Sequence, residues 1–94
     1  MARRPSDPNF SVLGERSIQN LYDFLNAEVD LGITFAGMAR RYLEAGNSER
    51  YETNKRYALA ALEAIDHFKG RLPPDLRMQI EARRSGLATA VSPL

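Results

Sequence analysis

His67 is the only histidine in the chain, and imidazole is the side chain best suited to metal binding or proton transfer near neutral pH. Glu63 precedes it by four residues, so in a helix the two side chains share one face. A di-metal site in a helical bundle needs two Glu-x-x-His pairs and further carboxylates. This chain has one histidine at a different spacing from its glutamate. We therefore interpret Glu63 and His67 as part of a solvated polar face and predict no metal site.

The residues needed for nucleophilic or cofactor chemistry are also poorly represented. The chain has no cysteine, which excludes disulfides, thiol catalysis and zinc sites that need thiolate. Ser17 and Ser48 are better placed to cap helices than to act beside a base. The glycines are scattered and form no phosphate-binding loop. We predict that the protein is not an enzyme and binds no cofactor.

Paired arginines are the one remaining feature that suggests a ligand. Arginine binds phosphate and carboxylate groups through bidentate hydrogen bonds, so the candidate anion contacts are Arg40, Arg41, Arg83 and Arg84. The chain carries 13 basic and 12 acidic residues, and a nucleic-acid-binding domain is usually clearly basic. The favoured interpretation is a solvated surface with local salt bridges. Nucleic-acid or anionic-ligand binding is the alternative function.

The elements that carry these residues are predicted to be helices. Apolar residues recur at helical spacing from Ile18 to Ala45, and a second apolar stripe runs beside the first. A surface helix normally has one narrower apolar face, so we expect this helix to be covered on two sides. Gly46 suits the left-handed position that ends a helix, and Asn47 or Ser48 caps the next one.

A second, alanine-rich helix and a shorter third helix follow, separated by Gly70 and the Pro73-Pro74 pair. A short connection makes long helices antiparallel neighbours. The predicted fold is therefore all-α: a long antiparallel helical hairpin with a shorter third helix, forming a three-helix bundle. The pattern leaves open whether the third helix packs on its own hairpin or on another chain. The predicted organisation is a flexible or partly docked N-terminal arm at 1–16, a helical domain at 17–91 with helices at about 17–45, 48–69 and 74–88, and a frayed tail at 92–94.

Part of the hairpin sequence resembles a known repeat family. Leu31-Gly32-x-x-Phe35, the Gly46-Asn47 turn and Tyr57-x-x-Ala60 resemble the helix-turn-helix of tetratricopeptide (TPR) repeats. The chain holds a single copy, and the stretch between Leu31 and Gly46 is about two turns longer than the family pattern. The resemblance implies a hairpin whose apolar surplus is covered by a neighbour, and no binding residues are taken from it.

The breadth of the apolar surface on the first helix predicts self-association. The candidate interface is its second stripe, which contains Tyr22, Val29, Ile33 and Ala36. The predicted function is a small helical protein–protein interaction or structural module, whose partner is a second copy of itself or another protein. No apolar run approaches the roughly 18 residues of a membrane span, and no apolar segment follows the basic N-terminus. The predicted location is the cytoplasm.

Overall fold

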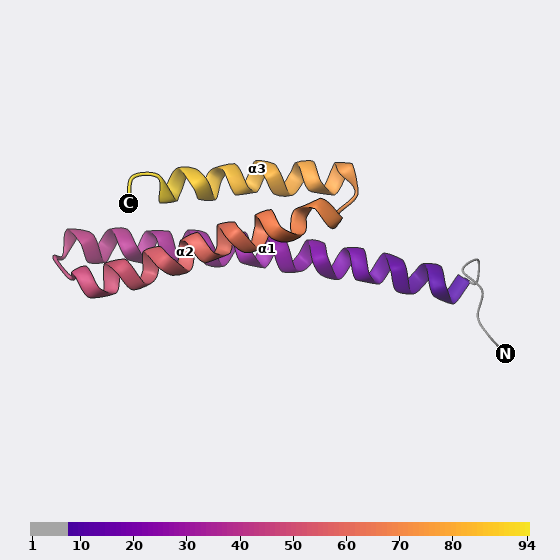
Figure 1. Ribbon diagram of the computed structural model, residues 1–94, viewed down its shortest axis with the longest axis horizontal. Coiled ribbons are helices and arrows are strands. Elements are labelled where there is room, and N and C mark those ends of the chain that lie inside the picture. Colours follow the sequence, from indigo (N-terminus) through magenta and orange to yellow (C-terminus); the bar gives the residue numbers. More distant parts are fainter. Residues whose placement is uncertain (1–7) are drawn as a thin grey trace.

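The computed structural model describes residues 8–94, with side chains from Arg16 onward. It contains three α-helices, α1 (Pro8–Glu44), α2 (Ser48–Phe68) and α3 (Pro74–Val91), and a short 3-10 helix, η1 (Lys69–Arg71). No strand occurs in this described part of the chain, which confirms the all-α class. Figure 1 shows α1 and α2 as an antiparallel hairpin with α3 alongside it. The third helix therefore packs on the hairpin of its own chain.

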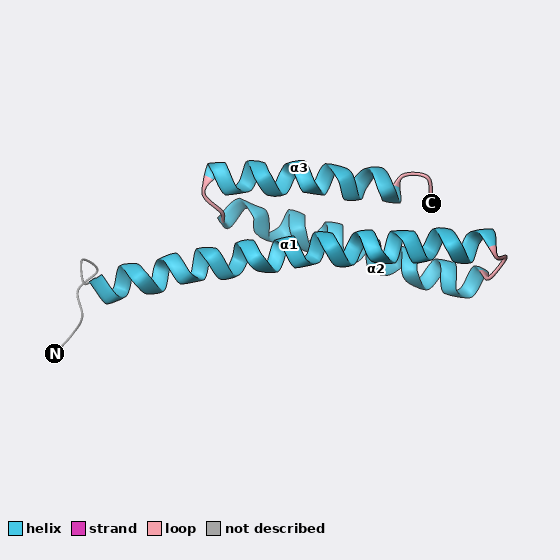
Figure 2. Ribbon diagram, turned by 180° about the vertical axis from the view of Figure 1, so that it is seen from behind, coloured by secondary structure: helices cyan, strands magenta, loops and turns pink. Residues whose placement is uncertain are grey.

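The first helix begins at Pro8, well before the predicted start near residue 17. Proline fits the first turn of a helix, where its missing N–H has no partner to lose. A single interior glycine costs only about 1 kcal/mol relative to alanine, so Gly14 does not end so long a helix. The predicted arm is thus wrong for residues 8–16, and residues 1–7 lie outside the described part. Ser17 lies inside α1 and is not its cap. Seen from behind, α1 extends past the connection between α2 and α3 (Figure 2).

The turn between α1 and α2 forms as predicted. Gly46 has a φ of 76°, the left-handed conformation that glycine adopts without strain. The N–H of Asn47 donates to the carbonyl of Tyr42 at 2.9 Å, and that of Gly46 to Leu43 at 3.1 Å. These bonds satisfy carbonyls that the end of α1 would otherwise leave unpaired. Asn47, rather than Ser48, caps α2, because its side chain accepts a hydrogen bond from the N–H of Arg50 at 3.1 Å.

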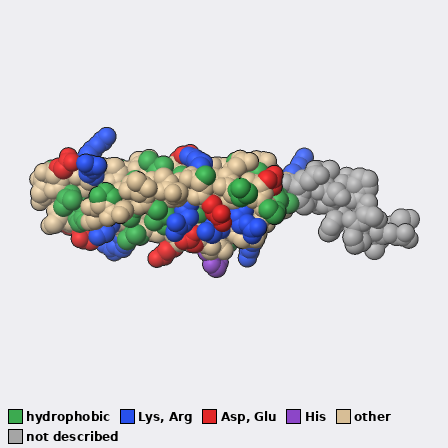
Figure 3. All heavy atoms as spheres, turned by 90° about the horizontal axis from the view of Figure 1, so that it is seen from above, with side chains coloured by type: hydrophobic (Ala, Val, Ile, Leu, Met, Phe, Trp, Pro, Cys, Tyr) green, Lys and Arg blue, Asp and Glu red, His purple; other side chains and the backbone are tan. Residues whose placement is uncertain are grey.

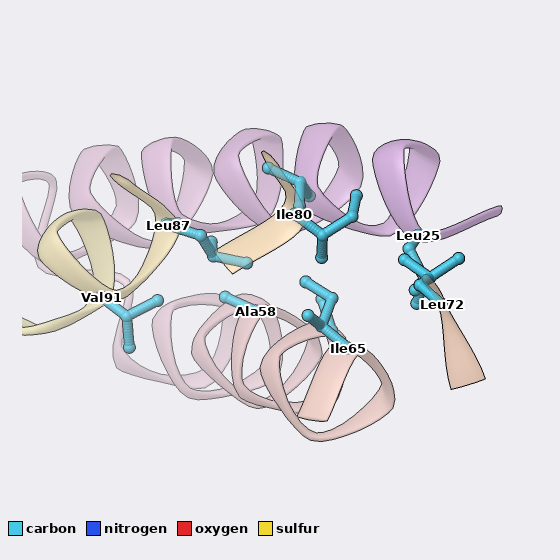
Figure 4. Close-up of a cluster of buried hydrophobic side chains, with 10 residues drawn as sticks. Leu25, Ala58, Ile65, Leu72, Ile80, Leu87 and Val91 are labelled. Atoms are coloured by element: carbon cyan, nitrogen blue, oxygen red, sulfur yellow. The ribbon is translucent and has the colours of Figure 1, made fainter. Parts of the chain in front are cut away.

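The hydrophobic core lies where the three helices meet. Ile80 and Leu87 of α3 point between the hairpin helices, into a cluster that also contains Leu25 and Ile65 (Figure 4). These four side chains are fully buried, and each contributes about 1.5–3 kcal/mol of burial free energy. Small residues let the helices approach closely: Ala58 and Ala61 are buried in α2.

The last residues of the chain are tied to the hairpin instead of fraying. The N–H of Leu94 donates to the carbonyl of Val91 at 3.0 Å. The carbonyl of Leu94 accepts hydrogen bonds from the hydroxyl of Tyr51 and, at 3.4 Å, from the ammonium of Lys55. The predicted frayed tail at 92–94 is wrong because Tyr51 and Lys55 of α2 bind the end of the chain. The sequence pattern does not reveal these polar partners.

Candidate protein-interaction surface

His67 and Glu63 are both exposed on the outer side of α2. The imidazole of His67 packs edge-on against the ring of Phe68, with centroids 4.6 Å apart. Among the described residues, no group of three or more histidine or acidic side chains is arranged to hold a metal ion. The geometry around His67 is that of a solvated ring resting on an apolar neighbour.

Two of the four candidate anion contacts are engaged within the chain. Arg83 donates through Nη1 to the side-chain oxygen of Asn26 at 2.6 Å and forms an ion pair with Asp30. Arg84 binds the carboxylate of Asp66 through two hydrogen bonds of 2.6 and 2.8 Å. Both guanidinium groups are therefore paired with acidic side chains of the same chain, which argues against an anion contact at this pair.

The other arginine pair lies elsewhere, near the hairpin turn. Arg40 and Arg41 are exposed, and Arg40 forms an ion pair with Glu44 one turn later. Asn26 and Asp30, which bind Arg83, lie about three to four turns before Arg40 on the same helix. The two arginine pairs therefore form no common patch. On the face that Figure 3 shows, basic and acidic side chains lie next to one another without a region of single sign.

Electrostatics reinforce the pairing between α2 and α3. The hydrogen bonds from Arg84 lower the pKa of Asp66, and the nearby ammonium of Lys69 lowers it further. The same bonds raise the pKa of Arg84. At the hairpin turn, the hydroxyl of Tyr42 raises the pKa of Arg50 by accepting its hydrogen bond. These shifts arise from contacts between helices, so they indicate structural ion pairs and hydrogen bonds.

The predicted interface stripe is divided by the fold. Val29 and Ala36 are buried in the core, where no second chain can reach them. Tyr22 is half-buried and donates a hydrogen bond to Gln79 of α3 at 2.7 Å. Ile33 alone is substantially exposed. The prediction of this stripe as an interface is wrong because α3 covers it in the same chain.

The uncovered apolar surface lies instead on the other side of the hairpin. α3 contacts the hairpin through Tyr22, Asn26 and Asp30 of α1 and through Asp66 of α2, and the C-terminal Leu94 contacts Lys55. Helical spacing places a second set of side chains away from α3. We call this surface the hairpin face, formed by Phe24, Leu31, Phe35, Met38 and Tyr42 of α1 and by Tyr57, Ala60, Ala64 and Phe68 of α2.

The centre of the hairpin face is apolar and open. Phe24, Leu31 and Tyr57 are 44, 49 and 52% exposed. Phe24 contacts Phe68 edge-on at 6.0 Å, and Phe35 contacts Tyr57 at 5.1 Å between ring centroids. These ring pairs fix both helices in register and present a firm surface. Glu28, half-buried between Phe24 and Leu31 on α1, is the acidic residue closest to its centre.

Arginines lie at the two ends of the hairpin face. The guanidinium of Arg50 stands 5.6 Å from the ring centre of Tyr42, near the turn. That of Arg71 stands 5.4 Å from the ring centre of Phe68, at the opposite end. Such stacking keeps the charges at the margin and covers part of each ring. The face is thus an apolar strip with polar ends, as protein interfaces commonly are.

The sequence contains a signal for this surface. Phe24, Leu31, Phe35 and Tyr42 belong to the first of the two apolar stripes that helical spacing defines between Ile18 and Ala45. Two apolar stripes predict that one packs within the chain and the other against a neighbour. Periodicity alone does not tell which stripe does which. The third helix decides the direction, and its cross-helix bonds link residues more than 50 positions apart.

No protein-family profile, curated protein or solved structure matches this chain. The resemblance to a TPR hairpin stays a prediction. No helix in the described part of the chain combines the length and the apolar character that crossing a membrane requires.

Proposed function

We propose that this protein is a small helical interaction module that self-associates through the hairpin face. The observation that carries the proposal is the exposure of Phe24, Leu31 and Tyr57 side by side on the uncovered side of the hairpin. Exposed apolar side chains that are contiguous mark interaction sites more often than scattered ones do. The cytoplasm is the proposed location, in keeping with a chain that has no cysteine.

The size of the hairpin face supports a second copy as the occupant. From Phe24 to Tyr42 the strip is about 27 Å long at 1.5 Å per residue, and two helices side by side are roughly 20 Å wide. Two copies would bury roughly 1,100 Å² in total, just above the threshold of about 1,000 Å² for a specific interface. The chain has a net charge of only +1, so two copies repel each other little. We expect a reversible dimer.

The experiment is a measurement of solution mass by sedimentation across a concentration series. The wild-type chain should move from monomer to dimer as its concentration rises. Leu31→Glu, on the hairpin face, should keep the helix content and remain a monomer. Ile33→Glu is the matched control, because Ile33 is exposed to a similar extent, 43% against 49%, on the side near α3. A wild-type chain that stays monomeric at every concentration would refute self-association.

The alternative function, binding of nucleic acid or another anion, has lost its main support. Arg83 and Arg84 are bound to Asp30 and Asp66, and the Arg40–Arg41 pair stands apart from them. A binding assay with a short DNA duplex at low salt tests this alternative directly, since phosphate binding depends steeply on salt.

A further inference from the structure

Seven exposed charged residues border the hairpin face and form no ion pair within the described part of the chain. They are Asp23 and Arg41 on α1, Glu49, Arg50, Arg56 and Glu63 on α2, and Arg71 in η1. Arg50 donates instead to the hydroxyl of Tyr42. Helical spacing places them on or near the outer edges of the face. Side chains in such positions surround an interface and set its orientation.

The contacts between α1 and α2 show which residues of the two helices lie at the same position, or level, along the hairpin axis. Phe24 contacts Phe68, Phe35 contacts Tyr57, and Tyr42 contacts Arg50. In each contact the α1 residue is as far from Gly32 in the sequence as its α2 partner is from Ala60. Gly32 and Ala60 therefore lie at the same level, halfway along the hairpin face.

The charges are arranged with opposite signs on either side of that level. Glu49 and Arg71 lie eleven residues before and after Ala60. Arg56 and Glu63 lie four residues before it and three after it. On α1, Asp23 and Arg41 lie nine residues before and after Gly32. Each exposed negative charge in this set thus has a positive counterpart near the mirrored position on the same side of the hairpin, whereas Arg50 and the half-buried Glu28 have no counterpart of opposite charge.

A two-fold axis at this level turns the pattern into ion pairs. If the axis lies in the interface and crosses the helices at right angles, α1 stacks antiparallel on α1 of the second copy, and α2 on α2. Each residue then meets the residue on the opposite side of the level. Arg56 faces Glu63 of the second copy, Arg71 faces its Glu49, and Asp23 faces its Arg41. By symmetry each of these pairs occurs twice.

The other face-to-face arrangement fits less well. An axis parallel to the helices would stack α1 on α2 of the second copy at unchanged levels. Asp23 would then approach Arg71 of the second copy and Arg41 would approach its Glu49, but Arg56 and Glu63 would meet no opposite charge. This arrangement forms two kinds of attractive pair instead of three, and electrostatic complementarity favours the arrangement with more of them.

We propose that the occupant of the hairpin face is a second copy of this chain in the first arrangement, with α2 antiparallel to α2 and Ala60 next to the two-fold axis. This inference rests on the proposed self-association and specifies its geometry. Because the two arrangements place different residues on the axis, they are distinguishable by cross-linking. The chain has no cysteine of its own, so a single introduced thiol reports without background.

The experiment is the oxidation of Ala60→Cys at a concentration where the wild-type chain is dimeric. A disulfide needs two Cα atoms about 4.4–6.8 Å apart, which the proposed geometry allows only near the axis. We expect Ala60→Cys to form a disulfide-linked dimer at least about ten times faster than Ala82→Cys, an exposed control on α3. If Ala60→Cys stays unlinked in a chain that sediments as a dimer, while a mixture of Leu31→Cys and Ala60→Cys does cross-link, the proposed arrangement is overturned.

Charge reversal provides a second readout of the same geometry. Glu63→Arg should weaken dimerisation about five- to tenfold, since two exposed attractive pairs become repulsive. The double variant Arg56→Glu/Glu63→Arg has the composition of the wild type and should recover its dimerisation constant. Loss without recovery would contradict the pairing of Arg56 with Glu63. A wild-type chain that remains monomeric would instead refute the self-association on which both tests depend.

Discussion

Arg83 and Arg84 are adjacent in the sequence and bind different helices. The guanidinium of Arg83 reaches α1, where it binds Asn26 and Asp30, while that of Arg84 reaches α2 and binds both oxygens of Asp66. Consecutive residues on a helix point about 100° apart, so one pair straddles the buried ridge that contains Ile80 and Leu87. The third helix is thereby fixed to both members of the hairpin at one level.

This arrangement predicts that either arginine stabilises the docking of α3. Arg83→Ala and Arg84→Ala should each lower the free energy of unfolding by about 1 kcal/mol, the value typical of a well-formed, partly exposed pair. Urea unfolding at one fixed chain concentration measures the change, because self-association would otherwise add to the stability. Arg77→Ala is the matched control on the same helix and should change stability by less than about 0.5 kcal/mol. Equal effects of all three variants would contradict the special role of the pair.

The ion pair between Arg84 and Asp66 also predicts an acid dependence of stability. The pKa of Asp66 is lowered in the folded chain, chiefly by its hydrogen bonds from Arg84. Because the pKa of Asp66 is lower in the folded chain, the ion pair contributes its full stability above the unfolded pKa of about 3.9. This contribution is lost as the pH falls through the folded pKa. Thermal unfolding followed from about pH 6 to about pH 2 should therefore show a smaller acid-induced decrease for Asp66→Asn than for the wild type. Parallel curves for the two chains would show that Asp66 contributes nothing to the acid dependence.

The structure distinguishes Asn47 from Ser48, which the sequence predicts equally as the cap of α2. Asn47→Ala removes the acceptor for the N–H of Arg50 and should cost about 1 kcal/mol of stability. Ser48 is the first residue of α2, beyond the capping position, so Ser48→Ala should cost less than about 0.5 kcal/mol. Chemical denaturation of the two variants measures the difference, and a larger effect at Ser48 would reassign the cap.

Local patterns predict the helices and the turn because each depends on residues close in the sequence. The backbone hydrogen bonds that Gly46 and Asn47 donate reach residues only three and five positions earlier in the sequence. The direction of the apolar faces is not predictable in this way. The stripe pattern assigns Val29 to an interface, whereas the structure buries Val29 and exposes Phe24 of the other stripe. That outcome depends on where α3 docks, which is set by contacts such as Tyr22 with Gln79.

The arginine pairs illustrate the same limit. Two adjacent basic residues look the same in the sequence whether they bind a phosphate or acidic side chains on two different helices. Asp30 and Asp66, the acidic partners of Arg83 and Arg84, lie 53 and 18 residues away in the sequence. Only the packing of α3 brings these groups together, so the sequence alone does not identify either partner.

The helices α1 and α3 approach each other closely at Gly32, and this contact predicts opposite effects for two similar substitutions. A Cβ on Gly32 would lie 2.6 and 2.9 Å from the methyl groups of Leu87 and 3.0 Å from the Cβ of Ala61. Leu87 is fully buried and has little room to move, so Gly32→Ala should destabilise the fold by about 1–3 kcal/mol. Gly37 lies in the same helix, and a Cβ added there would meet no atom within 4 Å. Gly37→Ala should therefore stabilise the fold by about 0.5–1 kcal/mol through helix propensity.

Urea unfolding of the two glycine variants at one chain concentration provides the comparison. Gly86→Ala, also in open space but on α3, serves as a second control and should behave like Gly37→Ala. If the loss at Gly32 comes from crowding against Leu87, shortening that side chain with Leu87→Val should cost less in the Gly32→Ala background than in the wild type. Additive effects of the two changes would show that the two residues are not in direct steric conflict, and the close packing of α3 on Gly32 would then be refuted.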